Sequence, residues 1–231
     1  MAITYIGKGA AESGDSIFPP TPDLPAGLQL HDLAVAFFYS EDTVDQTVAI
    51  SEGWTQLYNE RTSGGLAGAW YRFIQDGDEA PTFTIGPEFT AGSSLAQIAA
   101  WRSVDPADAV EFVGSLATTG PSGDVGPIGG IPYPANGLVL LLAGKLGDIG
   151  HSSSPTPGGL TWVGVDEADP PPGGISLQWW YAIAGGSPDT LADQTAIFGD
   201  SASTRGRGAM VSFNAGTGFH PALAANYRRR R

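Results

Sequence analysis

Short apolar runs, each followed by turn-forming residues, recur in the same order in the two halves of the chain. The four runs of the first half occupy residues 33–39, 53–55, 69–74 and 95–101. Their counterparts occupy residues 138–142, 159–162, 178–183 and 208–213, at an offset of roughly 105 to 112 residues. A repeat of this kind predicts that each half forms a set of short strands and that neither half buries its apolar face alone.

The spacing of apolar and polar residues within these runs is typical of β-strands. Residues 82–85 (TFTI) alternate between polar and apolar, as a half-buried strand does. The Asp76-Gly77-Asp78 sequence is typical of a hairpin turn. Residues 93–104 fit both a helical stripe and a strand, and the repeat favours the strand. We therefore expect strands at residues 30–39, 48–50, 54–58, 69–75, 82–85, 93–104, 138–145, 160–165, 175–184, 195–198 and 209–213.

Glycine and proline limit every regular element to a short length. The chain has 33 Gly and 18 Pro, and its longest stretch without either is residues 28–52, which excludes long helices. The sequence thus predicts an all-β fold, a jelly-roll-like β-sandwich built from two quasi-repeated halves. We expect an extended N-terminal lead-in over residues 1–29, a single sandwich domain over 30–225, and a basic C-terminal tail over 226–231. The two halves would span about 30–113 and 138–215, linked by a Gly/Pro-rich loop.

The charge is strongly acidic everywhere except near the C-terminal end. The formal net charge is −13, and because Arg228, Arg229, Arg230 and Arg231 contribute +4, residues 1–227 carry −17 (−13 minus 4). Such a body repels phosphate backbones, so we expect no nucleic-acid partner. The four arginines form a candidate docking tail for an acidic surface, including another copy of this chain; the alternative is a solvated chain end.

Cysteine, leader and membrane signals are missing from the sequence. The absence of cysteine removes disulfides, thiolate chemistry and Cys-based zinc sites. No basic segment precedes an apolar run at the N-terminus, so we expect no signal peptide. The most apolar run, residues 138–143, is far shorter than the ~20 residues that cross a bilayer, so we expect no membrane partner.

One pair of motifs would fit a hydrolase. Gly14-Asp15-Ser16 and the segment from Asp148 to His151 match the nucleophile and Asp-x-x-His blocks of the SGNH esterases. That nucleophile follows a buried strand of an α/β sheet, whereas this chain has no βαβ pattern, and the same tripeptide recurs at residues 199–201. The chain also lacks a Gly-x-Ser-x-Gly elbow. We therefore expect no catalytic residue and no enzyme activity.

Histidines and carboxylates do not show the spacing of metal ligands. His31, His151 and His220 are far apart in sequence, so a zinc site would require them to converge in space. Two carboxylate clusters offer the oxygen ligands that calcium prefers in loops of β domains. They contain Asp76, Asp78, Glu79 and Asp166, Glu167, Asp169. Neither cluster has EF-hand spacing, so we expect no metal and no cofactor, with bound calcium as the alternative.

Aromatic residues gather in two of the predicted strands. Because neighbouring residues of a strand point to opposite faces, Trp179 and Tyr181 share one face while Trp180 takes the other. Trp70 and Tyr71 divide in the same way. One face packs in the core, and the other requires a second layer, a subunit or a ligand such as a sugar ring. These five residues are the candidate interaction surface, and burial in the core or between subunits is favoured over a glycan platform.

A series of motifs in the first half has a counterpart in a known group of proteins. The motifs are residues 32–37 (DLAVAF), an acidic loop, and residues 53–57 (GWTQL), 70–73 (WYRF), 82–84 (TFT) and 98–105 (IAAWRSVD). Residues 30–105 thereby resemble a β-sandwich module of tailed-phage structural proteins of the tail-fibre, minor tail and capsid-decorating types. The family pattern usually has Pro before the Gly-Trp and Gly after the later Arg, where this chain has Glu52 and Ser103.

The resemblance implies a fold and a setting, and it carries no catalytic residue. We expect a non-enzymatic structural protein of a phage or phage-like virion that decorates the capsid or forms part of a fibre or tail. The implied partners are other virion proteins (major capsid or tail proteins) and further copies of this chain in a homo-oligomer. The implied location is the virion, assembled in the host cytoplasm. The alternative is a carbohydrate-binding β-sandwich module that binds a surface glycan through exposed aromatics. Calcium is an optional ligand of such a module.

Overall fold

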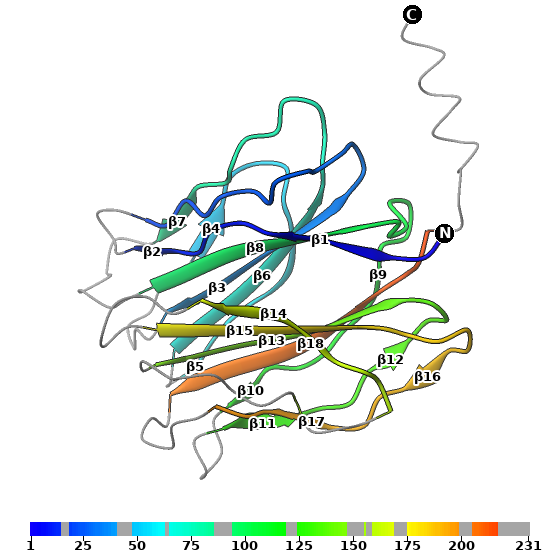
Figure 1. Cartoon of the computed structure of the whole chain (residues 1–231). Helices are drawn as coiled ribbons and strands as arrows, with labels where there is room; N and C mark the ends of the chain where they lie inside the picture. Colours follow the sequence, from blue (N-terminus) through cyan, green and yellow to red (C-terminus); the bar gives the residue numbers. More distant parts are fainter. Residues whose placement is uncertain are drawn as a thin grey trace, which may run out of the picture.

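The computed structural model describes residues 1–14, 19–40, 48–62, 65–85, 94–118, 124–146, 155, 159–168, 175–198 and 205–216. Every regular element in these residues is a β-strand, and the 18 strands form two six-stranded and three two-stranded sheets (Figure 1). The predicted all-β fold is confirmed. Among the described residues, no helix is long and apolar enough to cross a membrane.

The first large sheet is formed by the first half of the chain. Its strands lie in the order β1-β8-β3-β6-β5, and β2 also pairs with β8. All of these pairings are antiparallel. The strands are β1 (Thr4–Lys8), β2 (Glu12–Gly14), β3 (Leu33–Ser40), β5 (Thr55–Thr62), β6 (Gly65–Phe73) and β8 (Ser94–Arg102). Residues 1–29, expected as a lead-in, thus supply two short strands to the edge of this sheet.

The second large sheet is formed by the second half. Its order is β10-β18-β13-β15-β14, and β9 also pairs with β18. These pairings are antiparallel as well. The strands are β9 (Val110–Val113), β10 (Ala117–Thr118), β13 (Leu138–Leu146), β14 (Val163–Ala168), β15 (Ile175–Ile183) and β18 (Gly206–Phe213).

The two sheets repeat one topology. In chain order, β3, β5, β6 and β8 correspond to β13, β14, β15 and β18, and each set is arranged in space in the same way. The outer edge of β8 carries β1 and β2, as the outer edge of β18 carries β9 and β10. The prediction of a sandwich of two quasi-repeated halves is therefore confirmed. The jelly-roll detail is not confirmed, because each sheet comes from one half of the chain and its order differs from the 4-1-2-3 order of a Greek key.

One apolar core joins the two sheets face to face. Phe37 of β3 and Trp179 of β15 meet across the interface with ring centroids 5.7 Å apart and ring planes at 89°. The core also contains Leu33, Val35, Tyr39, Leu95, Trp101, Leu138, Leu140, Leu142, Leu177, Val211 and Phe213. Alternate residues of each strand point into this core, so the apolar faces of both halves cover each other.

Two further layers cover the outer faces of the sandwich (Figure 1). The pair β4 (Val48–Ile50) and β7 (Phe83–Ile85) lies over the first sheet and buries Trp70 and Phe38. The second sheet is covered by four short strands. These are β11 (Val125–Ile128), β12 (Pro132–Tyr133), β16 (Asp189–Thr190) and β17 (Gln194–Ala196). Residues 114–137, expected as a connecting loop, thus contribute strands and a buried apolar layer.

A buried carboxylate fastens one end of the first sheet. Asp32 precedes β3 and is 1% exposed. Its carboxylate accepts hydrogen bonds from Nε and Nη2 of Arg102, at 2.8 and 2.7 Å, and a third from the backbone amide of Gln29, at 2.7 Å. This fork ties the start of β3 to the end of β8 and to the preceding loop with charge-assisted bonds.

Candidate functional site

The tryptophans of the expected interaction surface are buried within the chain itself. Trp179 lies in the core between the sheets and is 1% exposed. Trp180 points to the opposite face and packs under the outer layer of the second sheet. Trp70 packs against Phe83 under the outer layer of the first sheet, with ring centroids 5.5 Å apart. The predicted division between faces is correct, and the cover on each face is another layer of the same chain.

The two tyrosines of that set lie at the margins of the central core. Tyr181 stacks on Tyr5 with ring centroids 5.1 Å apart. The rings of Tyr71 and Phe213 have their centroids 6.1 Å apart. Both side chains are half-buried. The five aromatics therefore do not form the exposed platform that a glycan or a second subunit would need, because strand pairing and the outer layers already cover them.

The structure describes only some of the expected metal and hydrolase residues. Asp78 forms an ion pair with Arg72 and accepts a hydrogen bond from the Gln75 amide at 2.8 Å. No group of three or more potential metal ligands occurs in the described part of the chain. Asp166 and Glu167 lie on β14 opposite β15. Ser16, Asp148, His151, Asp169, His220 and the docking-tail residues Arg228, Arg229, Arg230 and Arg231 lie outside the described residues.

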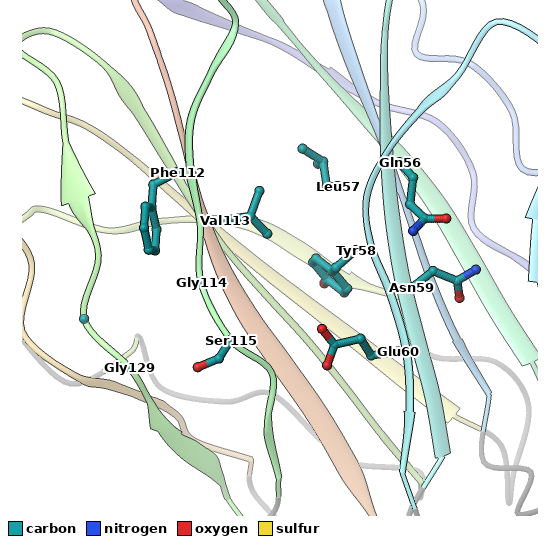
Figure 2. A pocket seen from close by; sticks show the side chains of 11 residues that line it. Gln56, Leu57, Tyr58, Asn59, Glu60, Phe112, Val113, Gly114, Ser115 and Gly129 are labelled. Atoms are coloured by element: carbon teal, nitrogen blue, oxygen red, sulfur yellow. The ribbon is translucent and has the colours of Figure 1, made fainter.

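A groove opens at one side of the sandwich. It has a volume of about 690 Å³ and runs between residues 56–60 of β5 and residues 112–115, with residues 129–130 at its border. The first wall belongs to the first sheet and the second wall to the second sheet. Figure 2 shows Leu57, Tyr58 and Glu60 on the side of β5 that faces Val113. We call this hollow the β5–β9 groove.

Each wall of the β5–β9 groove is hydrogen-bonded to other strands of the protein. β5 pairs with β6 alone, with a bulge between Gln56 and Tyr58. Asn59 turns away from the groove and donates a hydrogen bond from Nδ2 to the Val48 carbonyl at 2.7 Å. On the other side, the Gly114 amide donates to the Met210 carbonyl at 2.8 Å. Within the described residues no hydrogen bond joins the two walls, so β5 presents a free strand edge to the groove.

Tyr58 forms the floor of the groove and carries an unsatisfied polar group. Its side chain is 4% exposed and packs in the central core. Its hydroxyl oxygen is buried and has no hydrogen-bond partner among the described residues. Burial, and secondarily the charge of Glu60, raises the pKa of Tyr58 above its ordinary value, so the phenol stays protonated and available as a donor. A buried hydroxyl without a partner is uncommon in folded proteins and requires an explanation.

The chemistry of the groove suits recognition. It combines a free backbone edge, a buried phenol, the exposed carboxylate of Glu60 and the 41% exposed ring of Phe112. Its lining residues include no histidine, cysteine, lysine or arginine. A free edge of this kind pairs with an added strand through main-chain hydrogen bonds.

Sequence reasoning did not identify this groove. Its walls come from β5 and from a Gly-containing segment about 55 residues later, and they meet only because the two sheets stack. The lining residues are ordinary strand and turn residues without a motif. No family model matches the chain, and neither a curated protein nor a solved structure is similar enough to count as a match.

Proposed function

We propose that this chain is a non-enzymatic structural protein of a phage or phage-like particle, where it decorates the capsid or forms part of a fibre or tail. The observation that carries the proposal is the free edge of β5 beside the β5–β9 groove, which is a place to attach another stretch of polypeptide. The resemblance of residues 30–105 to phage β-sandwich modules supports the same setting. The partners would be major capsid or tail proteins and further copies of the chain.

The acidic surface and the layered core agree with such a role. A charge of −13 keeps a protein soluble and opposes indiscriminate association before assembly. The three stacked apolar layers leave a rigid body whose attachment depends on edges and loops. Rigid bodies with few attachment points suit symmetric assemblies, because the same contact recurs at every copy.

Quantitative mass spectrometry of density-purified particles from the source culture tests the proposal. A structural role predicts the chain at a fixed, integral ratio to the major shell protein, and the ratio separates head decoration from a fibre. Absence of the chain from purified particles, at a depth that detects other minor virion proteins, would refute the virion role.

A carbohydrate-binding module is the second candidate, favoured by the exposed ring of Phe112 among the residues that line the groove. Sugars bind where an aromatic face lies beside hydrogen-bonding groups. Isothermal titration calorimetry of the protein with surface glycans, carried out with and without calcium, tests this candidate. Binding that is lost in Phe112→Ala would place the glycan in the groove, and a lack of heat with every glycan would remove this candidate.

A further inference from the structure

The edge of β5 that borders the β5–β9 groove is regular enough to pair with another strand. Residues 58–62 pair with residues 69–65 of β6 in unbroken register. In the described sheet, β6 is the neighbour of β5 on one side and the other side is open. Residues 58–60 also line the groove, so the open edge and the groove form one site. A strand added there would lie about 4.8 Å from β5.

The alternation of side chains along β5 determines which positions of an added strand point into the groove. Tyr58 and Glu60 are two residues apart and share one face, and Figure 2 shows both on the side of β5 that faces Val113. Asn59 lies on the opposite face, where it donates a hydrogen bond to the Val48 carbonyl at 2.7 Å. Two alternate residues of an added strand, one beside Tyr58 and one beside Glu60, would therefore enter the groove.

The position beside Tyr58 suits an apolar side chain. The Tyr58 side chain is 4% exposed and packs in the central core. Leu57, Val113 and the 41% exposed ring of Phe112 also line this groove. An apolar residue placed among them would remove more of this surface from water, which is the main source of binding free energy for such a contact.

The position beside Glu60 suits a basic side chain. Glu60 is exposed and is the one charged residue among those that line the groove. Glu111 adjoins the second wall, is exposed, and accepts a hydrogen bond from Nδ2 of Asn214 at 3.3 Å. The chain as a whole carries −13. This charge favours a basic partner and repels an acidic one.

The Tyr58 hydroxyl favours a partner with a peptide backbone. The hydroxyl is buried and has no hydrogen-bond partner among the described residues. It needs an acceptor, which a basic side chain cannot provide, because lysine and arginine only donate hydrogen bonds. The carbonyl groups of an extended backbone are acceptors, and the same backbone supplies the groups that pair with the edge of β5.

We propose that the β5–β9 groove binds an extended, basic segment of a partner polypeptide as an antiparallel strand added to β5. Every strand pair of this sheet is antiparallel. In antiparallel pairing the residue beside Glu60 comes two positions before the residue beside Tyr58, so the segment has the order basic, any residue, apolar. This inference rests on the proposed function, since it names the kind of partner that the free edge of β5 would attach.

Two capped, fluorescently labelled peptides with the same composition test the predicted order. One has the sequence TTRTLTT, and the other has the reversed order TTLTRTT. Fluorescence anisotropy with the full chain should show that TTRTLTT binds at least about fivefold more tightly than TTLTRTT. A third peptide, TTETLTT, should bind about tenfold more weakly than TTRTLTT, because its glutamate meets Glu60.

Variants of the protein locate the binding in the groove. Glu60→Lys should reverse the preference, so that TTETLTT binds more tightly than TTRTLTT. Glu79→Lys makes the same charge change at an exposed residue that does not line the groove, and it should change each affinity by less than about twofold. Tyr58→Phe should weaken TTRTLTT by about two- to tenfold through the loss of one hydrogen bond. Denaturant unfolding of each variant confirms that it is folded.

Methylation of the peptide amides tests strand pairing itself. Alternate residues of a strand direct their amides to the neighbouring strand. Methylating one alternate set of amides in TTRTLTT should therefore abolish binding, and methylating the other set should change it by less than about twofold. Equal effects of the two sets would overturn the added strand.

Several other results would also overturn the proposal. They are a failure of TTRTLTT to bind at up to about 1 mM, tighter binding of TTLTRTT, and an unchanged preference in E60K. A dimer of the purified chain whose dissociation exposes the peptide site would assign the edge to a second copy instead. Peptide binding does not require a particle, whereas the virion role is judged by particle composition, so either can fail while the other holds.

Discussion

Replacing Phe37 by alanine tests whether the two halves form one cooperative unit. Phe37 is fully buried in β3 of the first sheet, and its ring meets Trp179 of the second sheet edge-on at 5.7 Å. The side chain therefore belongs to the interface between the halves. Removing it opens a cavity that borders both sheets.

The expected loss is large because the site is closed on all sides. Truncation of a buried Phe to Ala lowers the free energy of unfolding by about 3–5 kcal/mol. An edge-to-face aromatic pair accounts for about 0.5–1.5 kcal/mol of such a loss. A double-mutant cycle of Phe37→Leu with Trp179→Leu is expected to give a coupling energy in that range, since the two rings are in contact. Ile183→Ala, at a 42% exposed side chain, serves as the control and costs about 1 kcal/mol or less.

Denaturant unfolding followed by tryptophan fluorescence and far-UV circular dichroism measures these values. A single transition with an unchanged m-value and coincident probes is expected for F37A. Hydrogen exchange should speed up in β13 and β15 as much as in β3, because the halves share one core. Two separate transitions, or a loss confined to residues of the first half, would refute the reasoning that the sheets unfold together.

Three further outcomes follow from particular contacts. Gly144→Ala is expected to lower the free energy of unfolding by about 1–3 kcal/mol, because a Cβ there would lie 2.5 Å from Cγ of Tyr39. Gly185→Ala is the control. It should leave the melting temperature unchanged, because its Cβ would meet nothing within 4 Å. Asp32→Ala should lower the melting temperature and make residues near Gln29 sensitive to protease, since three hydrogen bonds are lost, whereas Glu79→Ala should do neither. Added salt should raise the parent melting temperature, because the net charge of −13 makes the folded chain repel itself and salt screens this repulsion. A fall on adding salt would contradict this.

The sheets and their repeat were predictable because their signal is local. Residues 48–50 were expected as a strand and are β4. The ambiguous residues 93–104 contain β8, a strand whose burial on both faces hides the alternation that separates a strand from a helix. Comparison with the second half decided that case correctly. Turn chemistry at glycine and proline placed most strand ends to within a few residues.

Of the outer-layer strands, β4, β7 and β17 were expected from the sequence, whereas β11, β12 and β16 were not. β12 and β16 are two residues long, too short for any periodicity, and a run such as residues 125–128 contains Gly126 and Pro127, which signal a loop. One clue was present: residues 33–40 are apolar almost throughout and are buried on both faces, which requires a cover on each side. The same absence of a local signal applies to the β5–β9 groove, whose walls depend on how the sheets stack.

The assignment of each sheet to one half of the chain has a consequence during synthesis. The hydrogen bonds of β1 to β8 can all form once residue 102 has left the ribosome, because no strand of the second half is needed for that sheet. The inner face of the sheet, with Val35, Phe37 and Leu95, stays uncovered until β18 has been made at residue 213. At 5–20 residues per second this interval lasts about 5–20 s. The nascent first half therefore exposes a broad apolar sheet for seconds, which makes it a binding target for ribosome-associated chaperones.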